Sequence, residues 1–303
     1  MWSILIASGA AWGVTVALVT LTLSTGYHPI GMSFWLSVIV FGMLTVIQIV
    51  RRKRLPMTRP YIVFCIVCGF LGTALPQILS FTTAVELDAG IRSAAYATIP
   101  LVTMLFAILF ALEKANLKRL AGIGLGAAGM LILARPDVGV VKPEDTVWLI
   151  LSLGIAVSYA LETVYIAKTR PPEIDPITAL WGMTAAAIMM MAPVTMTVDN
   201  GFYIASNWGI AELSLVTIAA LHVGCYSTFI YMIDKAGTVF ASQVAYIVAP
   251  AGVIGGIFIL SEEPSLALAL SIGLVLTGTV LVKPVEKLPA PLPAPVLEPD
   301  RKS

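Results

Sequence analysis

Charged side chains are scarce in this 303-residue sequence. Asp, Glu, Lys and Arg make up 12% of the residues, whereas a soluble globular domain averages about 25%. Hydrophobic residues make up 58%, and the net charge is only +1. A water-soluble chain with so few charges could not cover its surface, but a lipid bilayer solvates apolar faces. The composition therefore excludes an ordinary soluble domain and predicts an integral membrane protein.

Signatures of catalysis and cofactor binding are missing as well. Three cysteines provide no disulfide framework, and Cys65 and Cys68 have the spacing of a metal-binding pair without accompanying ligands. The sequence contains no Gly-x-Ser-x-Gly or His-Glu-x-x-His motif. We therefore expect no metal, no cofactor and no enzymatic activity. The basic run at residues 51–54 indicates an anchor for anionic lipid rather than a nucleic-acid site.

Apolar segments recur along almost the whole chain. A helix needs about 20 apolar residues to cross about 30 Å of hydrocarbon, and a β-barrel would instead show alternating strands of about ten residues. We therefore predict an all-α integral membrane protein with ten transmembrane helices. The predicted spans are residues 3–23, 30–50, 61–81, 90–111, 118–134, 146–168, 177–196, 209–232, 239–260 and 265–283.

The basic residues fall in alternate loops. If the N-terminus is cytoplasmic, only Arg92, Arg135 and Lys142 of the 18 Lys and Arg residues lie on the outer side. Cytoplasmic loops carry the excess of Lys and Arg in membrane proteins. The asymmetry predicts an even number of spans with both termini in the cytoplasm. The first apolar run lacks a preceding basic region, so we expect it to remain as a helix and not to be cleaved.

The two halves of the chain resemble each other. Residues 95–100 read AYATIP and residues 245–250 read AYIVAP, and Glu113 and Glu263 each follow the last proline by 13 residues. Each copy holds five predicted spans, and because five is odd the copies must have opposite orientations. Inverted repeats are typical of transporters, with substrate bound near the midplane where the repeats meet. The predicted division is a first repeat at 1–136, a second at 137–284 and a Pro-rich, disordered cytoplasmic tail at 285–303.

These residues resemble the drug/metabolite transporter superfamily in its EamA-type branch. The resemblance is carried by Ala11-Trp12-Gly13, by residues 89–101, by Glu113 and by a Gly-rich fifth span ending at Arg135-Pro136, with a second copy in residues 236–284. It implies a ten-helix fold in a bacterial inner membrane, with both termini cytoplasmic and a central cavity lined by helices one, three, four, six, eight and nine. Many relatives export amino acids and related metabolites. By the same resemblance, we expect Trp12 to face the cavity.

Two prolines and two ionisable groups lie well inside predicted spans. Pro100 and Pro250 free the carbonyls of Tyr96 and Tyr246, four residues back. A freed carbonyl in a bilayer must face protein or a wet cavity. Each Tyr-x3-Pro therefore indicates either a structural kink or a part of the cavity lining.

Glu162 lies in the sixth span, where a carboxylate costs about 2.5–3.5 kcal/mol. We expect it to face the interior beside Tyr159, while His222 and Tyr226 share a face of the eighth span. Glu162 and His222 are candidates for proton coupling, and the alternative for each is a buried structural contact. Arg92 either attracts a substrate carboxylate or pairs with an acidic neighbour at the outer mouth, Glu86 or Asp88.

Gln77 and Gln243 are polar enough to avoid lipid and suit either a pocket or a bridge between helices. The predicted cavity residues are Trp12, Gln77, Tyr96, Pro100, Tyr159, Glu162, His222, Tyr226, Gln243, Tyr246 and Pro250.

A cavity lined by Tyr, Trp, Gln and His suits a small zwitterion better than a sugar phosphate, which would require several Lys or Arg. We predict an exporter of small metabolites, amino acids or related zwitterions, that works by alternating access. The alternatives are a sodium- or proton-coupled symporter of another inverted-repeat fold, or an exporter of drugs or other metabolites. The expected partners are a small-molecule substrate and membrane lipid, with no nucleic acid; we expect a monomer, with a dimer as the alternative.

Overall fold

The computed structural model describes residues 1–53, 55–110, 117–133, 141–171, 173–204, 208–263 and 265–281. All regular elements of this part of the chain are helices. They are α1 (Trp2–Leu23), α2 (Pro29–Arg51), α3 (Arg59–Gly69), the π-helix η1 (Phe70–Ala74), α4 (Leu75–Glu86), α5 (Ala89–Tyr96), α6 (Ile99–Leu109), α7 (Leu117–Leu133), the 3₁₀ turn η3 (Pro143–Asp145), α8 (Thr146–Thr169), α9 (Pro176–Met196), α10 (Ile210–Ala236), α11 (Thr238–Ser242), α12 (Ala245–Leu260) and α13 (Leu266–Leu281).

Eight helical runs in the described residues are long and apolar enough to cross a membrane. The prediction of an all-helical, multi-pass membrane protein is therefore confirmed. The other two predicted spans are α7, with 17 residues, and α13, with 16. At 1.5 Å per residue these helices are about 24–26 Å long, close to the lower limit for a span. The count of ten spans stays a prediction.

Three of the long runs are not uniform α-helices. The third predicted span is α3 and α4 joined through the π-turn η1, the fourth is broken between α5 and α6, and the ninth is broken between α11 and α12. Pro100 stands in the first turn of α6, where the missing N–H removes no hydrogen bond. Pro250 lies inside α12. The break in the ninth span precedes this proline by several residues, at Gln243 and Val244.

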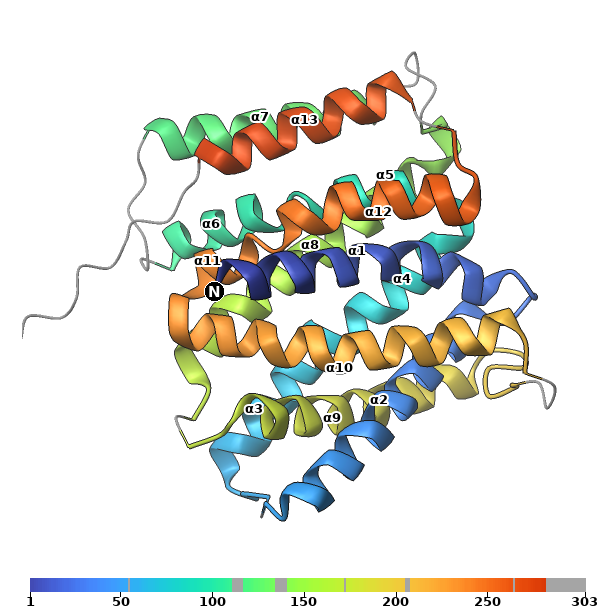
Figure 1. Ribbon diagram of the computed structural model, residues 1–303, viewed down its shortest axis with the longest axis vertical. Helices are drawn as coiled ribbons and strands as arrows, with labels where there is room; N and C mark the ends of the chain where they lie inside the picture. Colours follow the sequence, from blue (N-terminus) through green and yellow to red (C-terminus); the bar gives the residue numbers. More distant parts are fainter. Residues whose placement is uncertain are drawn as a thin grey trace, which may run out of the picture.

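The helices pack in layers (Figure 1). In that view α7 and α13 run side by side along one edge, while α2, α3 and α9 lie at the opposite edge. Between these edges, α1 packs along α12 and α10, and α8 packs along α4 and α6. The centre of the molecule therefore lies among α1, α4, α8, α10 and the two broken spans.

Glycines allow the closest of these helix contacts. A Cβ atom at Gly13 would overlap Ala251 of α12, and one at Gly278 would overlap the backbone of α7 at Gly122. Small residues at such contacts let helix backbones approach each other closely in a membrane. Gly13, which the sequence analysis noted only as part of a motif, therefore has a packing role between α1 and α12.

The N-terminus of α5 is capped by a side chain from the other half of the chain. The backbone N–H groups of Ala89 and Gly90 donate to the Glu262 carboxylate, at 2.6 and 3.0 Å. A carboxylate satisfies the orphan N–H groups of a helix start and complements the helix dipole. The sequence comparison matched Glu113 with Glu263, whereas the contact belongs to Glu262. Glu113, the boundary at 136–137 and the tail at 285–303 lie outside the described residues.

Replacing Glu262 by Ala should lower the free energy of unfolding by about 0.5–2 kcal/mol, because two N–H groups of α5 lose their acceptor. Thermal unfolding of the purified protein in detergent measures this change. Glu263→Ala is the matched control, since Glu263 is exposed and should leave the unfolding midpoint nearly unchanged. Equal midpoints for the two variants would contradict the assignment of the cap.

Candidate functional site

A cavity of about 120 Å³ lies in the centre of the bundle, where α1, α2, α4, α8 and α10 face the broken spans α5–α6 and α11–α12. Seven of the eleven predicted cavity residues line it. They are Trp12, Gln77, Tyr96, Tyr159, Glu162, His222 and Tyr226.

The other four predicted residues are not part of the lining. On α12 the cavity is lined by Ala245 and Val248. Because successive residues of an α-helix are rotated by about 100°, Tyr246 and Pro250 belong to other faces of this helix. Pro100 is buried at the start of α6 directly after the lining residue Ile99, and Gln243 is buried in the break between Ser242 and Val244, which both line the cavity.

The structure adds lining residues that the sequence analysis missed. Ser80 and Phe81 follow Gln77 on α4, Thr15 and Val19 follow Trp12 on α1, and Phe229 follows Tyr226 on α10. All five positions are three, four or seven residues from a predicted cavity residue. Helical periodicity from the residues already chosen would have identified them.

Glu162 is the chemical centre of the cavity. Its side chain is fully buried, and one carboxylate oxygen, Oε1, accepts a hydrogen bond from the Tyr226 hydroxyl. The second oxygen, Oε2, has no hydrogen-bond partner in the described part of the chain. Buried polar atoms are nearly always hydrogen-bonded, so an open acceptor at this position marks a place for a donor that the chain itself does not supply.

The π-turn η1 makes room for this pair. Its central residue, Gly72, lies so close that a Cβ atom there would overlap both the Glu162 carboxylate and the Tyr226 hydroxyl. The Gly72 carbonyl oxygen is 3.4 Å from the same hydroxyl. π-turns within α-helices are rare and frequently occur at functional sites. Three elements distant in the sequence, η1, α8 and α10, therefore meet at one carboxylate.

Aromatic rings form the wall beside Glu162. The Trp12 ring lies 5.9 Å from Tyr226 and 5.7 Å from Phe229, both edge to face, and the Tyr226 and Phe229 rings are 6.0 Å apart. The His222 ring is 5.0 Å from Tyr226. These separations are typical of favourable aromatic pairs. The wall beside Glu162 is therefore predominantly aromatic.

Neutral polar groups occupy other parts of the lining. The Gln77 carbonyl oxygen accepts from the Ser37 hydroxyl at 2.7 Å, and the Tyr96 hydroxyl lies 3.0 Å from Ser80 Oγ. Gln77 Nε2 and His222 Nε2 have no partner in the described residues. The cavity therefore combines one carboxylate with several neutral groups that can donate hydrogen bonds.

Arg92 does not line the cavity. It is fully buried, but its Nη2 atom donates to the Val16 carbonyl at 3.0 Å and to the Thr20 hydroxyl at 2.5 Å, and its Nε donates to the Leu87 carbonyl. These bonds tie α5 to α1. Among the described residues, Arg92 neither faces the cavity nor forms an ion pair with Glu86 or Asp88, and its Nη1 has no partner, so the structure shows a packing role instead of either sequence-based interpretation.

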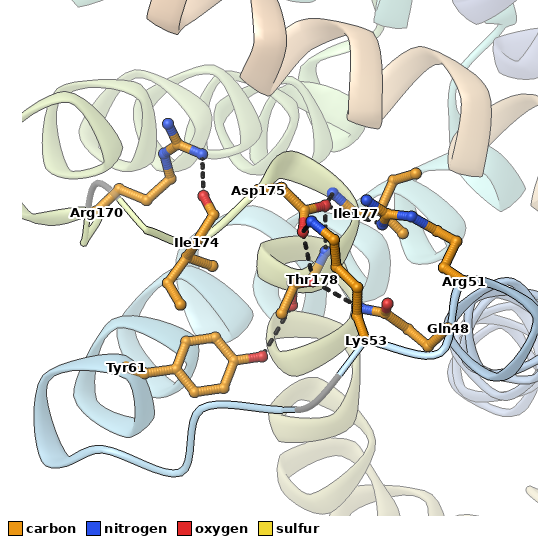
Figure 2. Close-up of polar contacts among 9 residues, drawn as sticks. All are labelled: Gln48, Arg51, Lys53, Tyr61, Arg170, Ile174, Asp175, Ile177 and Thr178. Carbon is orange, nitrogen blue, oxygen red and sulfur yellow. Dashed lines mark hydrogen bonds and ion pairs between the residues drawn. The ribbon is translucent and has the colours of Figure 1, made fainter.

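Charged side chains gather at the N-terminus of α9 (Figure 2). Asp175 caps α9 by accepting from the Ile177 and Thr178 N–H groups, and it also forms ion pairs of 2.9 Å with Arg51 and Lys53. At the same end, Arg170 pairs with Asp234 of α10. Arg51 and Lys53 of the basic run therefore contribute to helix packing, and the contact of the run with lipid stays a prediction.

Comparisons with known proteins agree with this architecture. The sequence profile of the EamA-like transporter family matches residues 1–135 and 146–283. The chain belongs to the EamA-like transporter family. Membership confirms that the protein is a transporter and not an enzyme.

Similar proteins are named as transporters, and a similar solved structure shares the fold. Over 286 residues the chain is 23% identical to the uncharacterized transporter YvbV of Bacillus subtilis (strain 168), covering 91% of this chain and 89% of the relative. It is 22% identical over 258 residues to the uncharacterized inner membrane transporter YedA of Escherichia coli (strain K12), covering 84% and 82%. A solved structure described as "Crystal structure of protein" matches with a TM-score of 0.61 and 18% identity, over 92% of this chain and 96% of that chain.

Replacing Gly72 by Ala should destabilise the EamA-family protein by about 1–3 kcal/mol, the usual effect of overpacking a filled site. Unfolding in detergent measures this change. The matched control is Gly224→Ala on α10, where an added Cβ meets no atom within 4 Å and should be neutral or slightly stabilising. If Gly72→Ala is as stable as this control, the close packing of η1 against Glu162 and Tyr226 is wrong.

Stability should also fall at acidic pH through Asp175. Burial by itself would raise the pKa of this carboxyl, but hydrogen bonds from Lys53, Arg51 and Thr178 outweigh burial and hold its pKa well below the usual value. A carboxyl group whose pKa is lower in the folded state than in the unfolded state stabilises the folded protein. This stabilisation is fully present above the unfolded-state pKa, about 3.9, and is lost as the pH falls toward the folded-state pKa. The stability advantage of the wild type over Asp175→Asn should therefore be large at pH 7 and smaller at pH 3.

Thermal unfolding of both proteins in detergent at the two pH values measures this difference. The exposed Asp199 supplies the control variant Asp199→Asn, which should differ little from the wild type at either pH. A wild-type advantage over Asp175→Asn that is the same at pH 7 and pH 3 would contradict the ion-pair assignment.

Proposed function

We propose that this protein exports small metabolites that carry an amino group, such as amino acids and related zwitterions, by alternating access through the central cavity. The observation that carries the proposal is the fully buried Glu162 with one open oxygen in a cavity between the two halves of the chain. A carboxylate inside a membrane protein is costly and typically marks a substrate or ion pathway.

An inverted-repeat arrangement of the ten predicted spans is supported by matched helix contacts. In the two predicted repeats α1 corresponds to α8, α2 to α9, α3–α4 to α10, and α5–α6 to α11–α12. The α1–α12 contact then corresponds to α8–α6, the α1–α10 contact to α8–α4, and the α3–α9 contact to α10–α2. All six contacts occur. The family profile likewise matches two segments of similar length. Repeats of this kind support alternating access by movement of one half against the other around a fixed site.

The proposed orientation places both termini in the cytoplasm of a bacterial cell, with the chain in the inner membrane. This follows from the distribution of Lys and Arg and is supported by the inner-membrane name of a relative. The charged cluster around Asp175 then lies at the cytoplasmic end, where ion pairs between helices can hold the cavity closed on that side.

Reporter fusions test the orientation directly. With ten spans and a cytoplasmic N-terminus, a reporter at Ser303 should be cytoplasmic and one inserted at Lys142 should be external. Fusions that report the same side of the membrane for both positions would contradict the ten-span topology.

The proposed activity is tested by uptake into proteoliposomes from a mixed amino-acid panel. Replacing Glu162 by Gln should lower the transport rate at least about tenfold, because a lost charged hydrogen bond costs about 1.5–3 kcal/mol. Glu212→Gln is a matched control: Glu212 is also buried and also accepts from a tyrosine hydroxyl, Tyr27, but it is not in the cavity lining. Wild-type uptake of no panel member, or equal rates in both variants, would refute the proposal.

A further inference from the structure

The charges of the cavity are unbalanced. Among the described residues that line it, Glu162 is the only carboxylate, and none is Lys or Arg. The buried guanidinium of Arg92 is not part of the lining; its Nη2 donates to the Val16 carbonyl and the Thr20 hydroxyl, and its Nη1 has no partner in the described residues. A free amino acid carries one positive and one negative group, but this cavity holds a fixed charge for only one of them.

We propose that Glu162 and the rings of Trp12, Tyr226 and Phe229 form an ammonium-binding subsite, so that the cavity selects its substrate by the amine and does not require a carboxylate. This inference rests on the proposed function and deepens it. Amines that lack the carboxylate of an amino acid then become ligands of the same site.

The open carboxylate oxygen provides the first element of the subsite. An ammonium group has three N–H donors, and Glu162 Oε2 is a buried acceptor with no partner in the described chain. Leaving a buried charge unpaired is strongly destabilising, and pairing it with a charged donor recovers much of that cost. An ammonium group supplies both the donor and the opposite charge.

The aromatic wall provides the second element. The side chains of Trp12, Tyr226 and Phe229 lie within 6.0 Å of one another by ring centre, and Tyr226 is hydrogen-bonded to Glu162 itself. A cation within about 6 Å of a ring centre is attracted by the π-face, most strongly by that of Trp. A group that reaches Glu162 therefore lies beside rings that favour positive charge.

The carboxylate of an amino acid meets only neutral groups. Gln77 Nε2 and His222 Nε2 are fully buried nitrogen atoms of the lining that have no partner in the described residues. Hydrogen bonds from neutral donors are about half as strong as those between charged groups. A substrate carboxylate is therefore tolerated here, whereas a substrate without an amine leaves Glu162 unpaired and brings a second negative charge into the cavity.

Matched ligands distinguish the contribution of the amine to binding from that of the carboxylate. The full-length protein in detergent is titrated calorimetrically with three ligand sets that share a side chain: ethylamine, alanine and propionate; isoamylamine, leucine and 4-methylpentanoate; phenethylamine, phenylalanine and 3-phenylpropanoate. In at least one set the amine should bind at least tenfold more tightly than the acid. If in no set the amine binds at least tenfold more tightly than the acid, the inference is overturned.

Variants assign the effect to Glu162. Glu162→Gln should reduce the preference for amine over acid at least tenfold, whereas Glu212→Gln should leave that ratio unchanged with the same loss of one negative charge. A purely structural role for Glu162 would alter stability but not the ratio. An unchanged ratio in Glu162→Gln, in a variant that still folds and binds, overturns the subsite.

Failure of this inference can be told apart from failure of the proposed function. If amino acids are transported but the ratio does not depend on Glu162, the subsite is wrong and the transport proposal stands. If amines bind through Glu162 but no amino acid is transported, the subsite stands and the proposed substrate class is wrong.

Discussion

A carboxylate buried in the middle of an apolar helical bundle is the constraint on which this structure depends. Glu162 is fully buried, and a charge at membrane depth is tolerated only with internal partners or a wet cavity. Tyr226 supplies one hydrogen bond, and the π-turn at Gly72 supplies the space in which the two side chains meet. The proposed substrate class follows from the remaining open oxygen.

The surrounding helices position this group through contacts within the first half of the chain and between the two halves. Gly13 lets α1 approach α12, Arg92 ties α5 to α1, and Glu262 caps α5 from beyond the end of α12. Each contact fixes a helix that lines the cavity. The ion pairs of Asp175 act at one end of the bundle, outside the cavity lining.

The helices were predictable because apolar length is a local property of the sequence, and Glu162 because a mid-membrane carboxylate must face inward. The rest depends on tertiary structure. Nothing in residues 70–74 signals a π-turn, and the Glu162–Tyr226 pair joins residues 64 positions apart. The rotation of α12, which directs Ala245 rather than Tyr246 to the cavity, is set by packing against α1. Two adjacent glutamates gave no local reason to prefer Glu262 as the cap of α5.

The most direct test of this account is an experimental structure of the full-length protein with the tightest-binding amine of the three ligand sets. The account predicts the amine nitrogen within hydrogen-bond distance, about 3 Å, of Glu162 Oε2, with the Trp12 ring beside it. A ligand bound outside the cavity, or one that turns its apolar end toward Glu162 and its amine toward Gln77, would contradict it.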